Sequence, residues 1–322
     1  MQYRPGIMHA GQFFLTGLIY TMTTPPNPIL KKLGFTPKDR LVIIHTDDIG
    51  MCQASVAAFS DLVEAGLISS GAVMMPCPWA LAAAEYSRQH PQVDMGVHAT
   101  LTSEWQTYRW GPVSTRKPAS GLLDPEGFFY HSSEEAQEHA DAGYVRQELA
   151  AQLDLALRWG MHPTHIDTHM GTVAHPKIML AYIELGLQHG IPPMLLRMDE
   201  KQWQEGGMDV HGAKMAVDML AQLEDQGIPL IDHLVGMPLD DPSERLERTK
   251  QTLLNLPPGV THFIIHPSKD TPELRAITPD WSSRVADYQT FTSPAMGDFL
   301  KTSGLNVIGY RALQQLLPSQ NH

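Results

Sequence analysis

The sequence has few cysteines, no long hydrophobic run and no excess of positive charge. Cys52 and Cys77 are its only cysteines, too few for a disulfide framework or for a zinc site made of four thiolates. The uncharged apolar stretch at residues 12–22 is far shorter than the roughly 20 residues needed to cross a bilayer. With 23 Lys and Arg against 35 Asp and Glu, the formal charge of −12 would repel a nucleic-acid backbone. We therefore expect neither a membrane nor a nucleic acid as partner.

Several motifs of common enzymes are also missing. The chain has no G-x-S-x-G nucleophile motif, and neither cysteine lies in a nucleophile motif, so covalent catalysis by the chain is disfavoured. It has no G-x-x-x-x-G-K-[ST] and no G-x-G-x-x-G, which removes the usual signals for nucleotide binding. Sixteen histidines and many carboxylates remain as the groups that could bind a metal ion or move protons.

The length and composition predict one large folded domain. Of the 322 residues, 43% are apolar and 18% are charged, which is typical of a globular chain with a sizeable core. We expect residues 1–36 to be an N-terminal extension, poorly structured or peripheral, and residues 37–322 to be a single domain. Only Arg4 precedes the apolar stretch and no clean cleavage site follows it, so the cytoplasm is the expected location, with secretion left open.

Short apolar runs alternate with amphipathic segments from residue 41 onwards. This alternation predicts parallel strands joined by crossover helices, and so an α/β barrel or a doubly wound sheet. Residues 103–140 interrupt it, and we expect them to form a functional insertion over one end. The expected strands lie at 41–46, 71–76, 95–101, 164–169, 194–198, 228–234, 261–267 and 306–310. The expected helices lie at 53–67, 79–89, 144–159, 176–189, 212–226, 243–255 and 290–302.

Polar residues stand at the carboxyl ends of four expected strands, which is the end that carries the active site in a parallel barrel. They are Asp47 and Asp48, His98, the 165–169 segment, and His266. Asp48 could simply cap the following helix. Together with His98 and His169, however, it supplies one oxygen and two imidazoles for a divalent cation that keeps a position for water.

The remaining polar groups complete a hydrolytic site. Asp47 would take a proton from the water, and His266, in its protonated form, would donate one to a leaving amine. Asp167 is placed to orient a ligand histidine. His45, His165 and His262 are expected to be core histidines with one hydrogen bond each. Trp105, Tyr108 and Trp110 could stack on sugar rings or form a small core of their own in the insertion.

The motifs at the expected strand ends resemble those of the YdjC-like carbohydrate deacetylase family, which includes chitooligosaccharide deacetylases. They are LVIIHTDDIGM, EAGLISSGAVMMP, MGVHATLT, PASGLLDPEGFF, THIDTHMGTVAHP and FIIHPS, within residues 40–315. The resemblance implies a distorted (βα) barrel of mainly parallel strands, related to the polysaccharide deacetylases. It also implies removal of an acetyl group from N-acetylated sugars.

Carried over position by position, the resemblance implies a role for each matching residue. Asp47 would be the general base and His266 the catalytic histidine, and Arg197 falls where family members often keep an arginine near the substrate. The chain departs from the family pattern at Ile49, at 103–105 and at 170–174, positions that would line the sugar site. The metal ligands implied are Asp48, His98 and His169.

We therefore expect a deacetylase that uses one divalent metal ion, zinc or magnesium, although manganese, cobalt and nickel also suit these ligands. The alternatives are a metal-dependent hydrolase of another amide or of a phosphate ester, and a carbohydrate-binding barrel without catalysis. The expected partner is a small carbohydrate substrate. A homodimer is the default oligomeric expectation from base rates.

Overall fold

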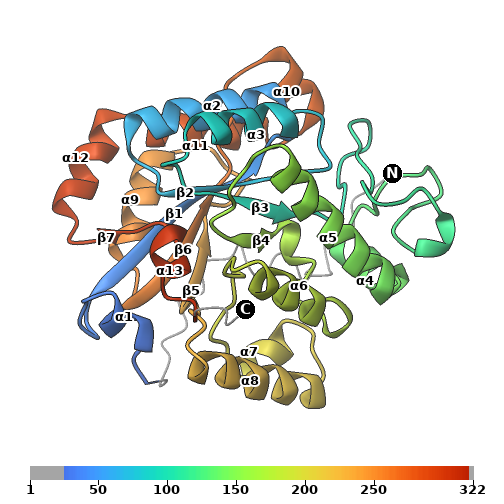
Figure 1. The fold of residues 1–322 in the computed structure, drawn as a ribbon. Helices are drawn as coiled ribbons and strands as arrows, with labels where there is room; N and C mark the ends of the chain where they lie inside the picture. Colours follow the sequence, from blue (N-terminus) through green and yellow to red (C-terminus); the bar gives the residue numbers. More distant parts are fainter. Residues whose placement is uncertain (1–24, 319–322) are drawn as a thin grey trace.

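The structure is a computed structural model that describes residues 25–318, and a parallel sheet lies at its centre (Figure 1). The strands are β1 (Arg40–Ile49), β2 (Ser70–Val73), β3 (Met95–Ala99), β4 (Ile166–Thr168), β5 (His233–Gly236), β6 (Gly259–Ile265) and β7 (Asn306–Val307). Their order in the sheet is β4-β3-β2-β1-β6-β5, and β7 pairs with the start of β1. All pairings are parallel, so the carboxyl ends of the strands lie at one edge, as the sequence predicts.

The sheet curls into a half-barrel, which confirms the predicted fold class. Residues 192–197 lie between its two edges: Pro193 bridges to Ile166 of β4, and Leu196 bridges to Ile231 just before β5. The sequence predicts a strand at 194–198, but the structure has only these isolated bridges. Pro192 and Pro193 lack backbone N–H groups, and a regular ladder of hydrogen bonds cannot run through them.

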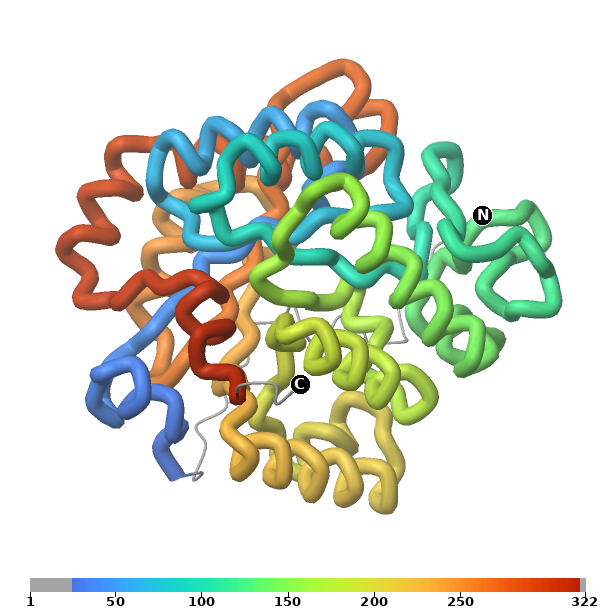
Figure 2. Tube along the Cα trace, viewed as in Figure 1, coloured from blue at the N-terminus to red at the C-terminus, as the bar shows by residue number. Residues whose placement is uncertain are grey.

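Helices surround the sheet, with α2, α3, α10 and α11 gathered along one side and α7 and α8 at the opposite end (Figure 1). The tube view shows how segments distant in sequence, such as blue α2 and orange α10, come together there (Figure 2). The helices are α1 (Pro28–Lys32), α2 (Gln53–Ala65), α3 (Ala80–Gln89), α4 (Ser133–His139), α5 (Ala142–Arg158), α6 (Pro176–Gln188), α7 (Glu200–Glu205), α8 (Val210–Asp225), α9 (Arg245–Leu254), α10 (Pro272–Ile277), α11 (Trp281–Phe291), α12 (Pro294–Thr302) and α13 (Tyr310–Gln314).

The largest difference from the predicted helices is at the C-terminal end. The sequence predicts one helix at 290–302, whereas the structure has α11 and α12, separated by Thr292 and Ser293. Pro294 cannot continue a preceding helix, but it is well suited to the first turn of a new one, and the Ser293 hydroxyl caps that turn. The sequence thus does not predict α11, which begins at Trp281 and contributes to the site described below.

The last part of the predicted N-terminal extension is folded. Residues 28–32 form α1, and the buried Ile29 and Leu30 pack against Leu41 of β1. These residues therefore pack against the core, although they belong to the predicted extension. The apolar stretch at 12–22 lies outside the described residues. Within residues 25–318, no helix combines the length and apolar character needed to span a bilayer.

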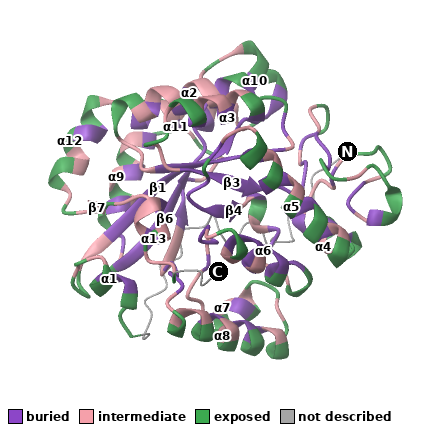
Figure 3. Ribbon diagram, in the orientation of Figure 1, coloured by how far each residue is buried: buried purple, intermediate pink, exposed green. Residues whose placement is uncertain are grey.

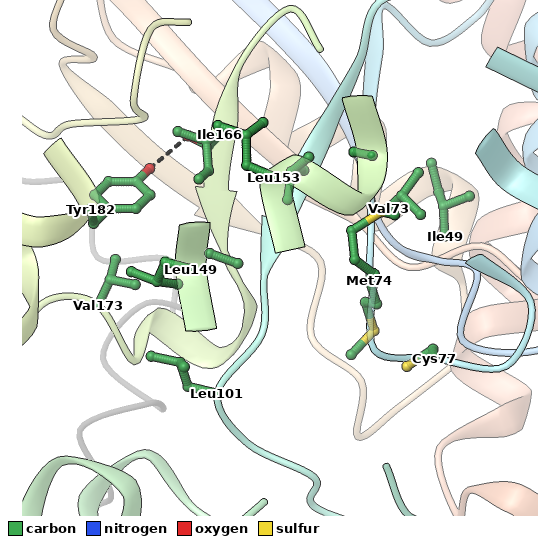
Figure 4. Packing of buried hydrophobic residues seen from close by; sticks show 14 of the residues in the cluster. Ile49, Val73, Met74, Cys77, Leu101, Leu149, Leu153, Ile166, Val173 and Tyr182 are labelled. Atoms are coloured by element: carbon green, nitrogen blue, oxygen red, sulfur yellow. Dashed lines mark hydrogen bonds between the residues drawn. The ribbon is translucent and has the colours of Figure 1, made fainter. Parts of the chain in front are cut away.

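The strands are buried almost throughout, while the outer faces of the helices are exposed (Figure 3). One large apolar cluster joins the ends of β1 and β2 to helices α5 and α6. Figure 4 shows Ile49, Val73 and Met74 in this cluster, together with Tyr182, which lies on α6. This packing fixes the positions of the strand ends, from which the polar residues emerge.

We expect Gly96→Ala in β3 to lower the free energy of unfolding by about 1–3 kcal/mol. A Cβ at Gly96 would lie 2.5–2.6 Å from the His165 ring and carbonyl oxygen, so β3 and the chain before β4 would have to separate. The matched control is Gly212→Ala in α8, where a Cβ would meet only the movable Met208 side chain and a capping carboxylate. The free energy of unfolding of that variant, measured in urea, should equal that of the parent or exceed it by up to about 1 kcal/mol.

Candidate functional site

Asp47 and Asp48 emerge from an irregularity at the end of β1. The pairing of β1 with β2 shifts register between Thr46 and Ile49. Asp48 itself has a φ of 60°, in the left-handed region that residues with a Cβ rarely adopt. Bulges and strained residues are concentrated at functional sites, where they aim side chains that a regular strand would turn away. Here the bulge brings both carboxylates to the same cavity.

Asp48, His98 and His169 come together at this edge of the sheet, as their sequence positions predict. One ligand atom from each lies within 4.8 Å of the other two. The Nδ1 atom of His169 is 3.1 Å from Oδ1 of Asp48, and Nε2 of His98 is 3.6 Å from the same oxygen. Ligand atoms about 2 Å from a tetrahedral zinc ion are themselves about 3.3 Å apart, so the spacing suits a small divalent cation.

Unsatisfied polar atoms in the cluster also fit a cation. Oδ1 of Asp48 and Nε2 of His98 are buried, and neither makes a hydrogen bond of good geometry within the described protein, although Nδ1 of His169 lies 3.1 Å from the Asp48 oxygen. Such atoms are costly unless a ligand or an ion binds them. The other nitrogen of His98, Nδ1, is 2.8 Å from Oδ1 of Asp167, the arrangement that fixes a metal-binding imidazole with Nε2 facing the ion. Asp167 thus contacts one of the two histidines that are predicted as ligands.

Carboxylates set the charge of both histidines. Burial alone would lower the pKa of His98, but the charges of Asp167 and Asp47 raise it to about 9. Burial likewise opposes protonation of His169, yet Glu104 and Asp48 raise its pKa to about 10. Without a cation, both rings would therefore carry a proton at neutral pH. A cation would have to displace those protons in order to bind.

Asp47 lines the same cavity but is held from the opposite side by a second buried group. Nε2 of His45 lies 3.3 Å from Oδ1 of Asp47 and 2.8 Å from Oδ2 of Asp167, so this histidine stands between the two carboxylates. Burial is the main cause that raises the pKa of Asp47, to about 6. By distance alone, His45, Asp47, Asp167 and His262 could also hold an ion. The sequence gives no sign of this second group, because His45 and His262 stand in the middle of apolar strands.

The three histidines expected in the core are buried, as predicted. His45 Nδ1 lies 3.0 Å from the Ser70 hydroxyl, and His262 Nδ1 lies 2.6 Å from that of Tyr310. The ring of His165 stacks on Tyr310 with 3.9 Å between centroids. Burial holds the pKa of His165 and of His262 well below the usual range, so both are neutral. His45 differs from the expectation in that it also contacts two carboxylates of the site.

His266 lines the cavity opposite the metal-binding group. Its Nε2 atom is 3.8 Å from Oδ2 of Asp47, so the predicted base and the predicted acid face one another. Burial lowers the pKa of His266 to about 4. At neutral pH this ring is therefore neutral in the resting protein, not protonated as the sequence-based mechanism assumes. Any proton that it donates must reach it during the reaction.

Two residues of the site were missed from the sequence. Arg284 of α11 is buried and donates to Oδ2 of Asp48 at 2.7 Å and to Asp280 at 2.7 Å. Glu104 lies 3.1 Å from Nε2 of His169. The i,i+4 pair of Asp280 and Arg284 was the available signal, but it is common on exposed helices, and the helix itself was not predicted.

The three predicted substrate residues have different positions. Trp105 lines the cavity. Trp110 is buried, and its indole donates to the carbonyl of Thr102 at 2.8 Å, so it packs behind Trp105 as part of the insertion's own core. The structure does not bring Arg197 to the cavity. Its guanidinium pairs with Glu224 at 2.8 Å and with Asp232 at 2.9 Å, on the other side of residues 192–197.

We expect Arg284→Met to lower the free energy of unfolding by about 3–5 kcal/mol at pH 7 in metal-free protein, because it removes the buried guanidinium that pairs with Asp48. Burial tends to raise the pKa of Asp48, but Arg284 and His169 hold that pKa well below the usual range. A carboxyl group whose pKa is lower in the folded than in the unfolded state stabilises the fold above about pH 4. This contribution is lost as the pH falls through the folded-state pKa. The difference in free energy of unfolding between the parent and Arg284→Met, measured in urea titrations, should therefore become smaller below about pH 4.

Arg275→Met is the control for that substitution, since Arg275 pairs with Asp270 on the exposed face of α10. It should lower the free energy of unfolding far less than Arg284→Met does, with little pH dependence. An equal loss in the two variants would mean that the contact between Arg284 and Asp48 contributes little.

The sequence has recognisable relatives. Residues 41–302 match the family described as YdjC-like protein. A carbohydrate deacetylase from Thermus thermophilus is 31% identical over 295 residues, which cover 90% of this chain and 99% of the relative. A carbohydrate deacetylase from Thermoanaerobacter pseudethanolicus is 21% identical over 85% of this chain and all of its own length. A chitooligosaccharide deacetylase from Yersinia enterocolitica is 28% identical over 53% of this chain and 64% of its own.

A solved structure has the same fold. It belongs to a candidate cellobiose-phosphate cleavage protein from Enterococcus faecalis, with a TM-score of 0.66 and 20% identity. The match covers 85% of this chain and 99% of the other. At this identity the likeness supports the half-barrel architecture and nothing finer.

Proposed function

The chain belongs to the YdjC-like protein family, and from this membership we propose that it is a metal-dependent deacetylase of an N-acetylated sugar or small oligosaccharide. The curated relatives named carbohydrate deacetylase and chitooligosaccharide deacetylase support the reaction class. The observation that carries the proposal is the pair of unsatisfied ligand atoms on Asp48 and His98, beside a carboxylate in the same cavity that need not bind the ion.

Asp48, His98 and His169 would hold the cation. When bound, it would supply Lewis acidity, which activates a water molecule and polarises the carbonyl of the acetyl group. Asp167 orients His98 through the 2.8 Å contact to Nδ1, and Arg284 fixes Asp48 through its other oxygen. Because zinc and magnesium both accept carboxylate and imidazole ligands, either could serve.

Asp47 would act as the general base. Its carboxylate accepts the proton of the attacking water, whose oxygen forms the new bond to the acetyl carbon. His45 stabilises the position of this carboxylate from behind. The carbon–nitrogen bond then breaks, and the products are acetate and a free amine.

His266 would protonate the departing amine. Since its resting pKa is about 4, it starts neutral and takes up the proton that Asp47 has accepted, across the 3.8 Å between them. Nε2 of His266 then passes the proton to the amine nitrogen. Trp105, at the wall of the same cavity, would contact the sugar.

Acetate release from a panel of N-acetyl sugars, measured alongside the metal content of the purified protein, tests the proposal. We expect acetate and one free amine per turnover from at least one N-acetylated sugar, with about one bound divalent ion per chain. Phosphate release from sugar phosphates without any acetate would overturn the proposal in favour of the alternative hydrolase. Sugar binding by metal-loaded protein without turnover would favour a binding barrel.

A further inference from the structure

The cavity that contains the candidate metal cluster also has an apolar part. The whole cavity has a volume of about 420 Å³, which is within the range of small-molecule sites. Its wall includes residues of α6, α7, α8 and β5 and residues 194–198, together with residues 132–134 and residues from the 168–174 segment. The residues that form this apolar wall include Met179, Met194, Met198, Trp203, Leu220 and Leu234.

The polar atoms along the cavity beyond the metal cluster are mostly engaged within the protein. The Tyr182 hydroxyl donates to the carbonyl of Ile166 at 2.6 Å and accepts from the backbone N–H of Met194 at 2.9 Å (Figure 4). The hydroxyl of Ser133 is paired with Thr172 at 2.8 Å. The exception on the apolar wall is Nε1 of Trp203, which is buried without a partner in the described chain. That nitrogen is itself buried, so it offers no exposed donor to a molecule in the cavity.

A bare sugar would fit this part of the cavity poorly. Each hydroxyl buried there without a hydrogen bond would lose its hydration, and the apolar side chains named above offer no exposed donor in return. A hydrocarbon chain loses nothing polar and gains the removal of its surface from water. Methionine side chains are flexible and polarisable, so they adapt to chains of different length and shape. Because the apolar wall and the metal cluster border one cavity, a molecule bound at the cluster can reach both.

We propose that the substrate of this protein carries an apolar chain, which occupies the part of the cavity between α6 and α8 while the amide lies at the metal cluster. The inference rests on the proposed function and narrows its substrate class from simple N-acetyl sugars to amphipathic ones. The chain could be the acyl group that is removed, or it could be attached to the sugar that is released. In both cases the group that contacts the apolar wall is a hydrocarbon chain.

Two substrate series distinguish these sources. In the first, N-acyl glucosamines carry acyl groups of two, four, six and eight carbons. In the second, the group removed stays acetyl, and N-acetylglucosaminides carry methyl, butyl or octyl groups. We expect kcat/KM to rise about three- to four-fold for each added methylene in one series until the cavity is full. A rise in the first series identifies the acyl chain, and a rise in the second identifies the aglycone.

A cavity-filling variant gives a direct check. Leu220→Trp places a larger side chain on the apolar wall and should remove most of the rise in kcat/KM with chain length. The matched control is Met215→Trp on the same helix, where the side chain is exposed, and it should keep the full gain. If Leu220→Trp does not fold, Leu234→Phe makes the same test from β5.

Flat responses in both series, with measurable acetate release, would overturn the apolar-chain inference and leave the proposed function standing. If no substrate is turned over, the proposed function fails, and calorimetry with octyl glucoside decides the inference separately. Binding that is at least ten-fold weaker in Leu220→Trp than in Met215→Trp would support it. No binding of octyl glucoside to the parent protein would overturn it.

Discussion

Asp47→Asn should lower kcat on the acetylated substrate by about 10²–10⁴-fold while the fold and the bound metal stay unchanged. Asparagine keeps the size of the side chain, but its amide cannot accept the proton of the attacking water. The cavity position of Asp47 and its raised pKa, about 6 through burial, are both suited to a general base. Single-turnover acetate release, circular dichroism and metal analysis would measure the three quantities.

Asp298→Asn is the matched control for that loss, since Asp298 is exposed on α12 and pairs only with Lys301 among the described contacts. It should retain the rate of the parent. A near-normal rate in Asp47→Asn would remove Asp47 from the mechanism. Loss of metal in the same variant would instead make it a ligand, which its place in the second group with His45 and Asp167 would then explain.

Removal of the metal should abolish turnover, and zinc or another divalent ion should restore it. Binding of the ion only to the folded state should also raise the melting temperature, by about 5 °C at 100 times the dissociation constant. Because the pKa values of His98 and His169 are raised to about 9 and about 10, binding at neutral pH releases two protons. The apparent affinity should therefore fall by up to about 100-fold for each pH unit below pH 9.

Asp48→Asn separates the metal cluster from unrelated effects of chelators. It removes the carboxylate ligand but leaves the base, and it should reduce both metal content and turnover. Calorimetric titration at pH 6, 7 and 8 would give the affinity and the number of protons released. Turnover that persists after complete removal of metal, shown by elemental analysis, would contradict the proposed mechanism.

The sequence predicts the centre of the fold well because its signals are local. Each strand of the half-barrel is a short apolar run, and the polar residue that follows it marks the carboxyl end. Parallel pairing then brings Asp48, His98 and His169 together although 121 positions separate the first from the last. No finer geometry is needed for that inference, because strand ends in a parallel sheet share one edge.

Residues whose role depends on side-chain direction could not be predicted in this way. Arg197 ends an apolar run, as expected, but residues 192–197 make only isolated bridges, and its side chain turns to Glu224 and Asp232. Arg284 reaches the cluster from a helix whose pattern of apolar residues is weak. His45 lies two residues before Asp47 in β1, so their side chains share one face of the strand, but an apolar run of sequence does not signal that contact.

The ligand atoms and the apolar wall come from separate stretches of the chain. β1, β3 and the end of β4 supply Asp48, His98 and His169, whereas residues 176–234 supply most of the wall. Under the proposed function, exchange of this stretch between relatives would therefore change which substrates fit the cavity and leave the ligand atoms unchanged. Within such a lineage, substrate preference can diversify without passing through inactive intermediates, because the residues that vary are not those that carry the chemistry.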